Sequence, residues 1–393
     1  MNYQIRKKDF ARKEVSNMKK FCTSVMLTVL CVCPAWAQIN QYEFIRTSTF
    51  KTGVHAKLWD FDDESGFDRF AELSFPTTYS MAFGDRFAID LVTAPFVTAL
   101  ELTDGPALDY SNLSDSFGRV SVMLGDNLAL LTFGVGIPSG QTELTSEELV
   151  LAGLAANRPL NNPITNFGTG LNLHFGIAVA QDFGSWVIGA GAGYALRGDY
   201  DILFDDQNIQ IDPGDEMNLT LGVDREFRMA GGHGRFMADF VYTNYTEDEF
   251  KNLSFVYEAG DKIVVSGNLI LPLGFLNPLI LSARNRWRLD NKAQDPLLLD
   301  NGNELELRAT GISALSGSFK LKYIYRAQIY GENDQGIDGA LIHGFGGGLI
   351  LKLSRHFSFD PTFIYSVGSI DTGPDSDVEV TGYEFSGGFA ITF

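Results

Sequence analysis

Residues Tyr383–Phe393 read YEFSGGFAITF, and this stretch decides the fold. Its odd positions hold Tyr, Phe, Gly, Phe, Ile and Phe, whereas its even positions hold Glu, Ser, Gly, Ala and Thr. Such strict period-two alternation predicts a β-strand with one apolar and one polar face. The apolar face is rich in aromatic residues, whereas in a soluble sheet we expect a mostly aliphatic one.

The same alternation recurs along the chain. Residues 171–180 and 186–197 alternate throughout, and the second run has mostly Gly on one face. Further strands are predicted at Leu73–Phe83, Phe87–Val97, Val120–Leu124, Ala129–Ile137, Met217–Val223, Phe236–Tyr242, Ile263–Leu271, Leu279–Leu289, Leu305–Gly311, Phe319–Tyr330, Leu341–Leu353 and Phe357–Val367. The first candidate, Phe44–Leu58, is the weakest, and it fits either a strand or a plug or periplasmic arm. The total is about sixteen strands, within a range of about 14–18.

The links between these runs alternate in length. Short links with turn residues lie near residues 84–85, 125–127, 182–185, 228–234, 272–277, 314–317 and 354–356. Long polar segments lie between them, at Asp60–Asp68, Thr103–Asp115, Ser139–Asn166, Gly198–Asp215, Asn244–Asp261, Asp290–Asn303, Gly331–Asp338 and Ile370–Asp377. Transmembrane barrels have short periplasmic turns and long extracellular loops, and a spanning sheet must close because lipid cannot pair a free edge. The sequence therefore predicts an all-β, antiparallel, up-and-down transmembrane β-barrel.

The aromatic-rich final strand, which ends on Phe393, resembles the closing strand of bacterial outer-membrane β-barrels. That resemblance implies the outer membrane of a Gram-negative bacterium, where lipid and lipopolysaccharide would surround the protein. It also implies that the barrel-assembly machinery reads the strand ending at Phe393.

The N-terminal segment reads as a secretory leader. Lys19 and Lys20 precede an apolar run, and Ala35-Trp36-Ala37 fits a cleavage site. We therefore expect Met18 to be the initiator, cleavage after Ala37, and one barrel domain at residues 38–393, so that residues 1–37 are an upstream extension plus signal peptide. All three cysteines lie within this leader, which excludes disulfides and thiolate metal sites from the remainder. Loss of its seven Lys/Arg and two Asp/Glu moves the net charge from −19 to −24, and such an acidic chain argues against a nucleic-acid partner.

One group of adjacent strands is predicted to place many charges on the inner face of the barrel. These pore-lining candidates are Arg284, Arg286, Arg288, Glu304, Glu306, Arg308, Lys320, Lys322 and Arg326. Cross-strand neighbours of opposite sign pair, but cations outnumber anions here. The set fits either a basic wall that selects solutes or a ladder of ion pairs that stiffens the barrel.

The long segment 139–166 connects the fifth and sixth predicted strands. Within it, Thr145–Asn157 reads as a short helix with acidic residues in its first turn. This layout resembles the general porins, whose long loop after the fifth strand folds into the lumen. The resemblance implies that Glu143, Glu147 and Glu148 line a constriction and face the cluster Arg284–Arg288.

A second resemblance competes with the first. Residues 133–140 read FGVGIPSG and resemble the strand end of barrels that transport phenol meta-cleavage compounds, and more distantly the fatty-acid channels. It implies passage of hydrophobic small molecules, with residues 149–156 lining an apolar entry. The Asn-Pro-Phe signature of the fatty-acid channels is missing, and the arm before the first strand is short.

Enzymatic barrels are the third class. The five histidines, at 55, 174, 233, 343 and 356, lie in no motif of membrane phospholipases or deacylases, and the acidic loops match no calcium spacing. We therefore expect no catalytic residue, no metal and no cofactor. The sequence predicts a channel for passive diffusion of small solutes. The alternatives are a channel for hydrophobic compounds and a non-conducting structural barrel.

Overall fold

The computed structural model describes residues 47–62, 66–125, 128–156, 159–165, 167–204, 207–229, 232–251, 255–293, 298–299, 301–333, 337–373 and 377–393. The predicted leader, with Met18 and the cleavage site after Ala37, lies outside these residues. In the part that is described, no helix is both long and apolar enough to cross a bilayer.

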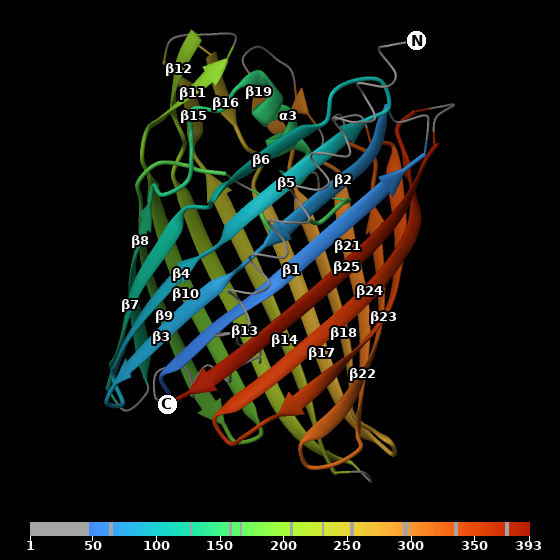
Figure 1. Cartoon of the computed structure of the whole chain (residues 1–393). Coiled ribbons are helices and arrows are strands. Elements are labelled where there is room, and N and C mark those ends of the chain that lie inside the picture. Colours follow the sequence, from blue (N-terminus) through green and yellow to red (C-terminus); the bar gives the residue numbers. More distant parts are fainter. Residues whose placement is uncertain are drawn as a thin grey trace.

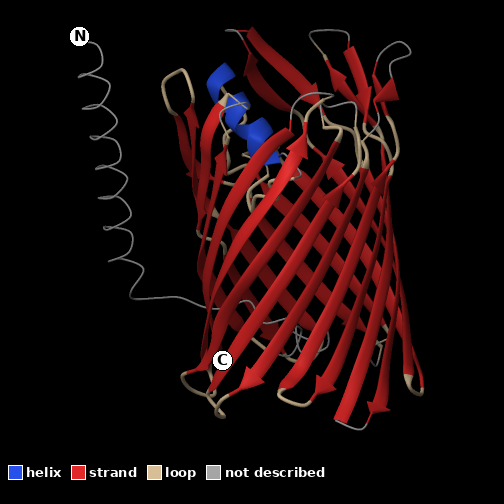
Figure 2. Cartoon of the chain, turned by 90° about the vertical axis from the view of Figure 1, so that its right-hand side faces the viewer, coloured by secondary structure: helices blue, strands red, loops and turns tan. Residues whose placement is uncertain are grey.

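Antiparallel strands form one closed barrel of sixteen strands, as the alternation predicts (Figures 1 and 2). Strand β1 closes the ring by pairing with β25 from Thr49↔Thr392 to Phe61↔Val380. The segment Phe44–Leu58 is therefore not a plug or arm where it is described, because β1 is a wall strand. The strands are β1 Thr49–Phe61, β2 Phe67–Ser74, β3 Thr77–Phe83, β4 Phe87–Thr93, β5 Pro95–Leu102, β6 Leu108–Leu113, β7 Ser116–Leu124, β8 Ala129–Ile137, β9 Asn172–Phe183, β10 Trp186–Arg197, β13 Glu216–Met229, β14 Gly232–Tyr245, β17 Lys262–Leu273, β18 Leu276–Arg288, β21 Asn303–Ala314, β22 Phe319–Tyr330, β23 Gly339–Lys352, β24 Phe357–Asp371 and β25 Asp377–Thr392.

Three wall strands are interrupted near their middle, which divides each into two labelled segments. Segments β2 and β3 form one wall strand, and both pair with β1. The next wall strand consists of β4, which pairs with β3, and β5, which pairs with β2. The third consists of β6, which pairs with β5, and β7, which pairs with β4. Proline lacks the N–H that a ladder needs, and Pro76 and Pro95 lie at two of the breaks. The predicted loop Thr103–Asp115 is wrong in part, because it contains β6.

The outer face of the barrel is apolar. Phe175 on β9, Leu221 on β13, Phe345 on β23 and Phe385 on β25 are all exposed, and each alternates with smaller or polar inward residues. An apolar belt over fully paired strands fits the hydrocarbon of a bilayer. The faces that the sequence predicts are therefore confirmed.

The links sort by length as predicted. At the end where the chain terminates, tight turns join the strands, as at Gly184, whose φ of 76° favours glycine. Phe393 lies at the same end, where its N–H donates to the Ser48 carbonyl. The long loops lie at the opposite, extracellular end. The predicted helix is present there as α3 Ser146–Ala156, with the Thr145 hydroxyl and the Glu148 carboxylate forming a capping box.

Three of the extracellular loops join into a second sheet that the sequence analysis did not predict. Its strands are β11 Tyr200–Phe204, β12 Gln207–Asp212, β15 Glu247–Phe250, β16 Phe255–Glu258, β19 Asn291–Ala293 and β20 Leu298–Leu299. Figure 1 shows this sheet beyond the long-loop end of the wall. Each strand is too short to show reliable alternation in the sequence.

The two faces of β9 give a direct test of this architecture. Ile177 points to lipid and Ala178 points inward on the same strand. We expect Ile177→Arg to lower the free energy of unfolding by about 2–4 kcal/mol in lipid vesicles, because a charge near the bilayer midplane is costly. The matched Ala178→Arg variant should stay within about 1 kcal/mol of the wild type. Urea titrations followed by tryptophan fluorescence measure both, and equal losses would contradict the assigned faces.

Candidate functional site

The charged residues predicted on the inner face of β18 and β21 lie together and form ion pairs. Leu281 and Trp287 are exposed on the outer face, which turns Arg284 and Arg286 inward. An amino group of Arg284 lies 3.0 Å from Glu306 and 3.6 Å from Glu304. Arg286 pairs with Glu304. The acidic residues of β21 therefore neutralise part of the arginine cluster.

The cations of β22 find partners on strands that the sequence analysis did not consider. Lys322 pairs with Asp360 on β24 and donates to the Thr362 hydroxyl at 2.6 Å. Arg326 lies 3.1 Å from Glu384 on β25, and its side chain is only 7% exposed. The basic wall is thus less basic than the sequence indicates, because Asp360 and Glu384 lie opposite it.

Glycines on the intervening strand β23 let these cations reach their partners. A Cβ at Gly348 would lie 3.0 Å from Lys322 Cε, and a Cβ at Gly344 would lie 3.5 Å from Arg326 Nε. The absence of side chains at these positions gives the two cations room along the inner face of β23. The alternate glycines at 344, 346 and 348 are visible in the sequence, but they do not show which carboxylates the cations reach.

Glu384 is the centre of a charged cluster at the seam between β25 and β1. Besides Arg326, it lies 3.4 Å from His55 Nε2 and 3.9 Å from Lys57 Nζ. The cluster joins β1, β22 and β25. A carboxylate shared by these groups ties the first strand to the last across the inner face.

Three of the predicted pore-lining cations remain without an ion pair in the described part of the chain. They are Arg288, Arg308 and Lys320. Among the predicted pore-lining cations, Arg308, which has no ion pair, and Arg284, which is paired, are both exposed. Arg284, with a side chain 45% exposed, is the most accessible of the predicted pore-lining cations that form ion pairs. Arg284 and Arg308 are therefore the pore-lining candidates that are best placed to meet water or a solute.

The long loop between β8 and β9 is anchored to the inner face of β1 and β2. Trp59 Nε1 donates to the Leu160 carbonyl at 3.1 Å, and Lys57 Nζ donates to the Asn161 carbonyl at 2.8 Å. The Ile164 N–H donates to the Glu72 carboxylate at 3.1 Å. All three wall residues are buried.

An apolar cluster surrounds these hydrogen bonds. Leu151 and Ala155 of α3 and Phe167 of the loop are buried with Trp59 and Phe70. The Phe167 ring centroid lies 4.7 Å from that of Tyr110 and 4.9 Å from that of Phe96. Residues Tyr330, Ala340, Ile342, Ile370, Val378 and Val380 complete the cluster. We call this inner face of β1, β2, β5, β6 and β22–β25 the packed sector.

The inner face of β9 and β10 differs from the packed sector. Its side chains are small, at Gly176, Ala178, Gly189, Gly191 and Gly193. Ala178 is exposed although it points inward. We call this face the open sector.

The acidic loop residues do not contact the arginine cluster. Glu143 and Glu147 are exposed, and Glu148 caps α3. None of the three forms an ion pair with Arg284, Arg286 or Arg288 among the residues that the structure describes. Their action across the lumen on Arg284–Arg288 stays a prediction.

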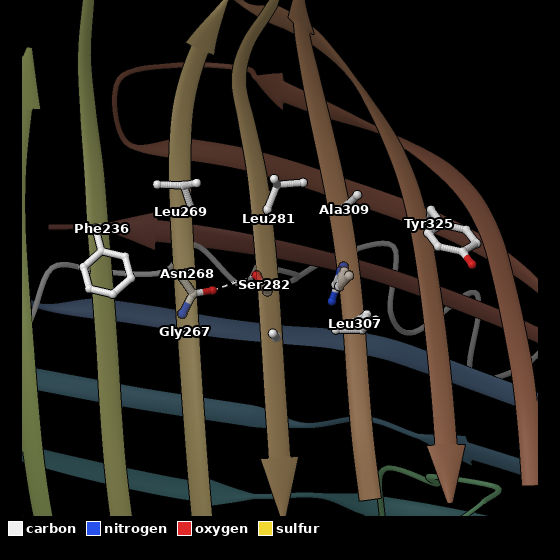
Figure 3. A pocket seen from close by; sticks show the side chains of 11 residues that line it. Phe236, Gly267, Asn268, Leu269, Leu281, Ser282, Leu307, Ala309 and Tyr325 are labelled. Atoms are coloured by element: carbon white, nitrogen blue, oxygen red, sulfur yellow. Dashed lines mark hydrogen bonds between the residues drawn. The ribbon is translucent and has the colours of Figure 1, made fainter. Parts of the chain in front are cut away.

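A groove of about 430 Å³ lies on the outer face (Figure 3). The small residues Gly267, Ala283 and Ala309 are among those that line it. Phe236 and Tyr325 flank it. Its apolar residues face lipid, whereas Asn268 and Ser282 form an inward hydrogen bond of 2.7 Å. Asn268, Ser282 and Arg308, which the alternation turns inward, are also among the residues that line the groove. Over the same described ranges, no cluster of His, Cys, Asp and Glu could hold a metal ion.

The chain has only distant structural likenesses among known proteins. No family model and no curated protein sequence matches the chain. Among solved structures, OccK11 (OpdR) of Pseudomonas aeruginosa is 10% identical with a TM-score of 0.46, over 88% of this chain and 96% of that one. OpdQ of the same species is 9% identical with a TM-score of 0.46, over 90% and 100% of the chains. The outer membrane channel DcaP of Acinetobacter baumannii is 11% identical with a TM-score of 0.40, over 92% and 100%. Likenesses this distant say nothing of solute or mechanism, and the porin-like layout rests on the closed sixteen-strand barrel itself.

The seam cluster predicts a stability difference between two carboxylates. Glu384→Gln leaves Arg326 and Lys57 without their shared anion, and removal of one buried partner costs about 3–5 kcal/mol. Glu306→Gln affects the partly exposed Arg284 and should cost less than about 1 kcal/mol. Equilibrium unfolding in vesicles compares the two variants. Equal effects would show that the seam cluster does not stabilise the closure.

Proposed function

We propose that this protein is an outer-membrane channel of a Gram-negative bacterium through which small solutes diffuse passively. The observation that supports this best is the contrast between the packed sector and the open sector. Sixteen strands enclose a space wide enough for an aqueous channel. The loop packs on one side of it, whereas Ala178 and Arg284 on the other side are accessible to water.

The loop 139–166 acts as the constriction in this proposal. Its anchors at Lys57, Trp59 and Glu72 favour a fixed position over a free loop. Glu143, Glu147 and Glu148 then contribute negative charge near the entrance, and the cations of β18, β21 and β22 contribute positive charge to the wall. The field between them selects among solutes, and a concentration gradient drives the flux.

A channel for hydrophobic compounds has less support. Its apolar entry would need the apolar side chains of α3 to be open to a solute. Leu151 and Ala155 are instead buried in the packed sector. The third candidate is a non-conducting structural barrel. The ion pairs of Arg286, Lys322 and Arg326 are compatible with it, but they would stiffen the wall of a conducting barrel equally. Conductance separates this reading from the first.

We propose no catalytic role. His343 and Tyr325 pair at 3.0 Å, with both residues on the outer face of the wall. His55 pairs with Glu384, and His174 packs edge-on against Phe117. In these contacts the rings of His343, His55 and His174 meet a phenol, a carboxylate and a phenyl ring rather than a serine hydroxyl. The proposed surroundings are outer-membrane lipid and lipopolysaccharide, and assembly would use strand β25 and Phe393.

Ion selectivity tests the charged wall. Arg308 is exposed and has no ion pair among the described residues, so Arg308→Glu changes the lumen charge without breaking a pair. We expect planar-bilayer recordings to show ohmic channels whose reversal potential in a salt gradient shifts toward cation selectivity. Lys292→Glu, which makes the same charge change in an extracellular strand, is the control and should shift it less. Absence of any current would argue for the non-conducting barrel.

Deletion of residues 145–157 tests the constriction. Replacement of this segment by a short Gly-Ser linker removes α3 and its packing against β5 and β6. We expect single-channel conductance to rise, because the conducting cross-section widens. A barrel that keeps its wild-type conductance after the deletion would count against the loop as the constriction.

A further inference from the structure

Two inward cations lie side by side at the extracellular end of the wall. Lys262 begins β17 and Arg288 ends β18, and the two are directly opposed in the strand register. Directly opposed residues have Cβ atoms about 4.5–5.5 Å apart. Val265 and Trp287 are exposed on the outer face, so alternation turns Lys262 and Arg288 inward.

The ring of one tyrosine, Tyr245, lies close to both cations. Lys262 Nζ and Arg288 Cζ each lie 5.5 Å from the centroid of the Tyr245 ring. Tyr245 ends β14 and is 8% exposed. The negative face of an aromatic ring attracts cations, which holds the two side chains in place without neutralising them.

Tyr257 of the extracellular strand β16 lies within electrostatic range of the same site. Burial raises the pKa of Tyr257, and the positive charge of Arg288 partly offsets this rise. The site is therefore at the mouth of the lumen, between the wall and the extracellular sheet.

Several carboxylates in this region are engaged elsewhere, including Asp248, which also acts on the pKa of Tyr257 and accepts a hydrogen bond from the Gly214 N–H at 2.6 Å. Glu216, opposite Tyr245, lies 3.7 Å from Arg197, and Glu258 lies 2.7 Å from Lys292. Glu304 pairs with Arg286. Asp261 accepts hydrogen bonds from Tyr242 and Asn244. Across the described ranges, Lys262 and Arg288 therefore form no ion pair.

Like charges directly opposed on adjacent strands destabilise a sheet. A negative ligand between them would relieve this repulsion. A guanidinium binds a carboxylate with two parallel hydrogen bonds, and an ammonium beside it supplies a further donor. The arrangement thus has the donors and the charge for one carboxylate group.

We propose that Lys262, Arg288 and Tyr245 form a binding site for the carboxylate of a small organic anion at the outer mouth of the lumen. This inference deepens the proposed function, on which it rests, by naming the class of solute. A solute held at the mouth has a raised local concentration there before it enters the passage.

Succinate is a suitable probe. Binding to the whole barrel in detergent is measured by ligand-observed NMR, which needs no current. We expect the Lys262→Gln/Arg288→Gln variant to weaken succinate binding at least tenfold. The Lys251→Gln/Lys292→Gln variant removes two positive charges from the extracellular sheet and should leave it within twofold. Circular dichroism checks the strand content of each variant. If the double variant does not fold, succinate binding is measured on the two single variants, Lys262→Gln and Arg288→Gln, instead.

The outcomes separate the two proposals. If succinate binds to the wild type and not to the double variant, the site is supported even when the barrel carries no current. Absence of current would then contradict only the proposed channel function. Equal binding by wild type and a folded variant overturns the site, as does absence of binding to the wild type. If bilayer current is present, succinate added on the extracellular side should reduce it, and this reduction should be lost in the double variant.

Discussion

The structure depends on one constraint: a sheet that spans lipid must pair every backbone N–H and C=O within itself. Pairing of β1 with β25 along its length meets this constraint by removing both edges. Glu384 then adds side-chain contacts to His55, Lys57 and Arg326 across the same seam. The apolar outer belt is a consequence of closure, since each inward residue leaves its neighbour facing lipid.

The interior of a closed barrel must be filled by side chains or by water. In this protein side chains fill one sector, and another is open to water. In the packed sector, the loop after β8 supplies Leu151, Ala155 and Phe167 to an apolar cluster. Trp59 and Glu72 form hydrogen bonds with the backbone of this loop. In the open sector, glycines and alanines leave space. The charged strands β18 and β21 lie further along the same wall and contribute the accessible cations Arg284 and Arg308.

Most of the fold was predictable from the sequence because lipid enforces alternation in every strand. The loop parity and α3 followed from turn chemistry and capping. Contacts along the inner face were not predictable, since Lys322–Asp360 skips strand β23 and Arg326–Glu384 skips both β23 and β24. Both contacts pass the glycines of β23. The anchors of the loop at Lys57 and Glu72 were missed for a related reason, because they join segments about a hundred residues apart. The extracellular sheet was missed because its strands are only a few residues long.

Cysteine accessibility tests most directly whether the interior is divided into a wet and a filled side. The chain has no cysteine after residue 33, so single substitutions in a protein that begins at Gln38 can be labelled without background. In lipid vesicles, a charged thiol reagent should modify Ala178→Cys rapidly, and should not modify Ile342→Cys, whose native side chain is 1% exposed behind the loop. Rapid and equal labelling of both positions would contradict the packed sector, and failure to label Ala178→Cys would contradict the aqueous passage.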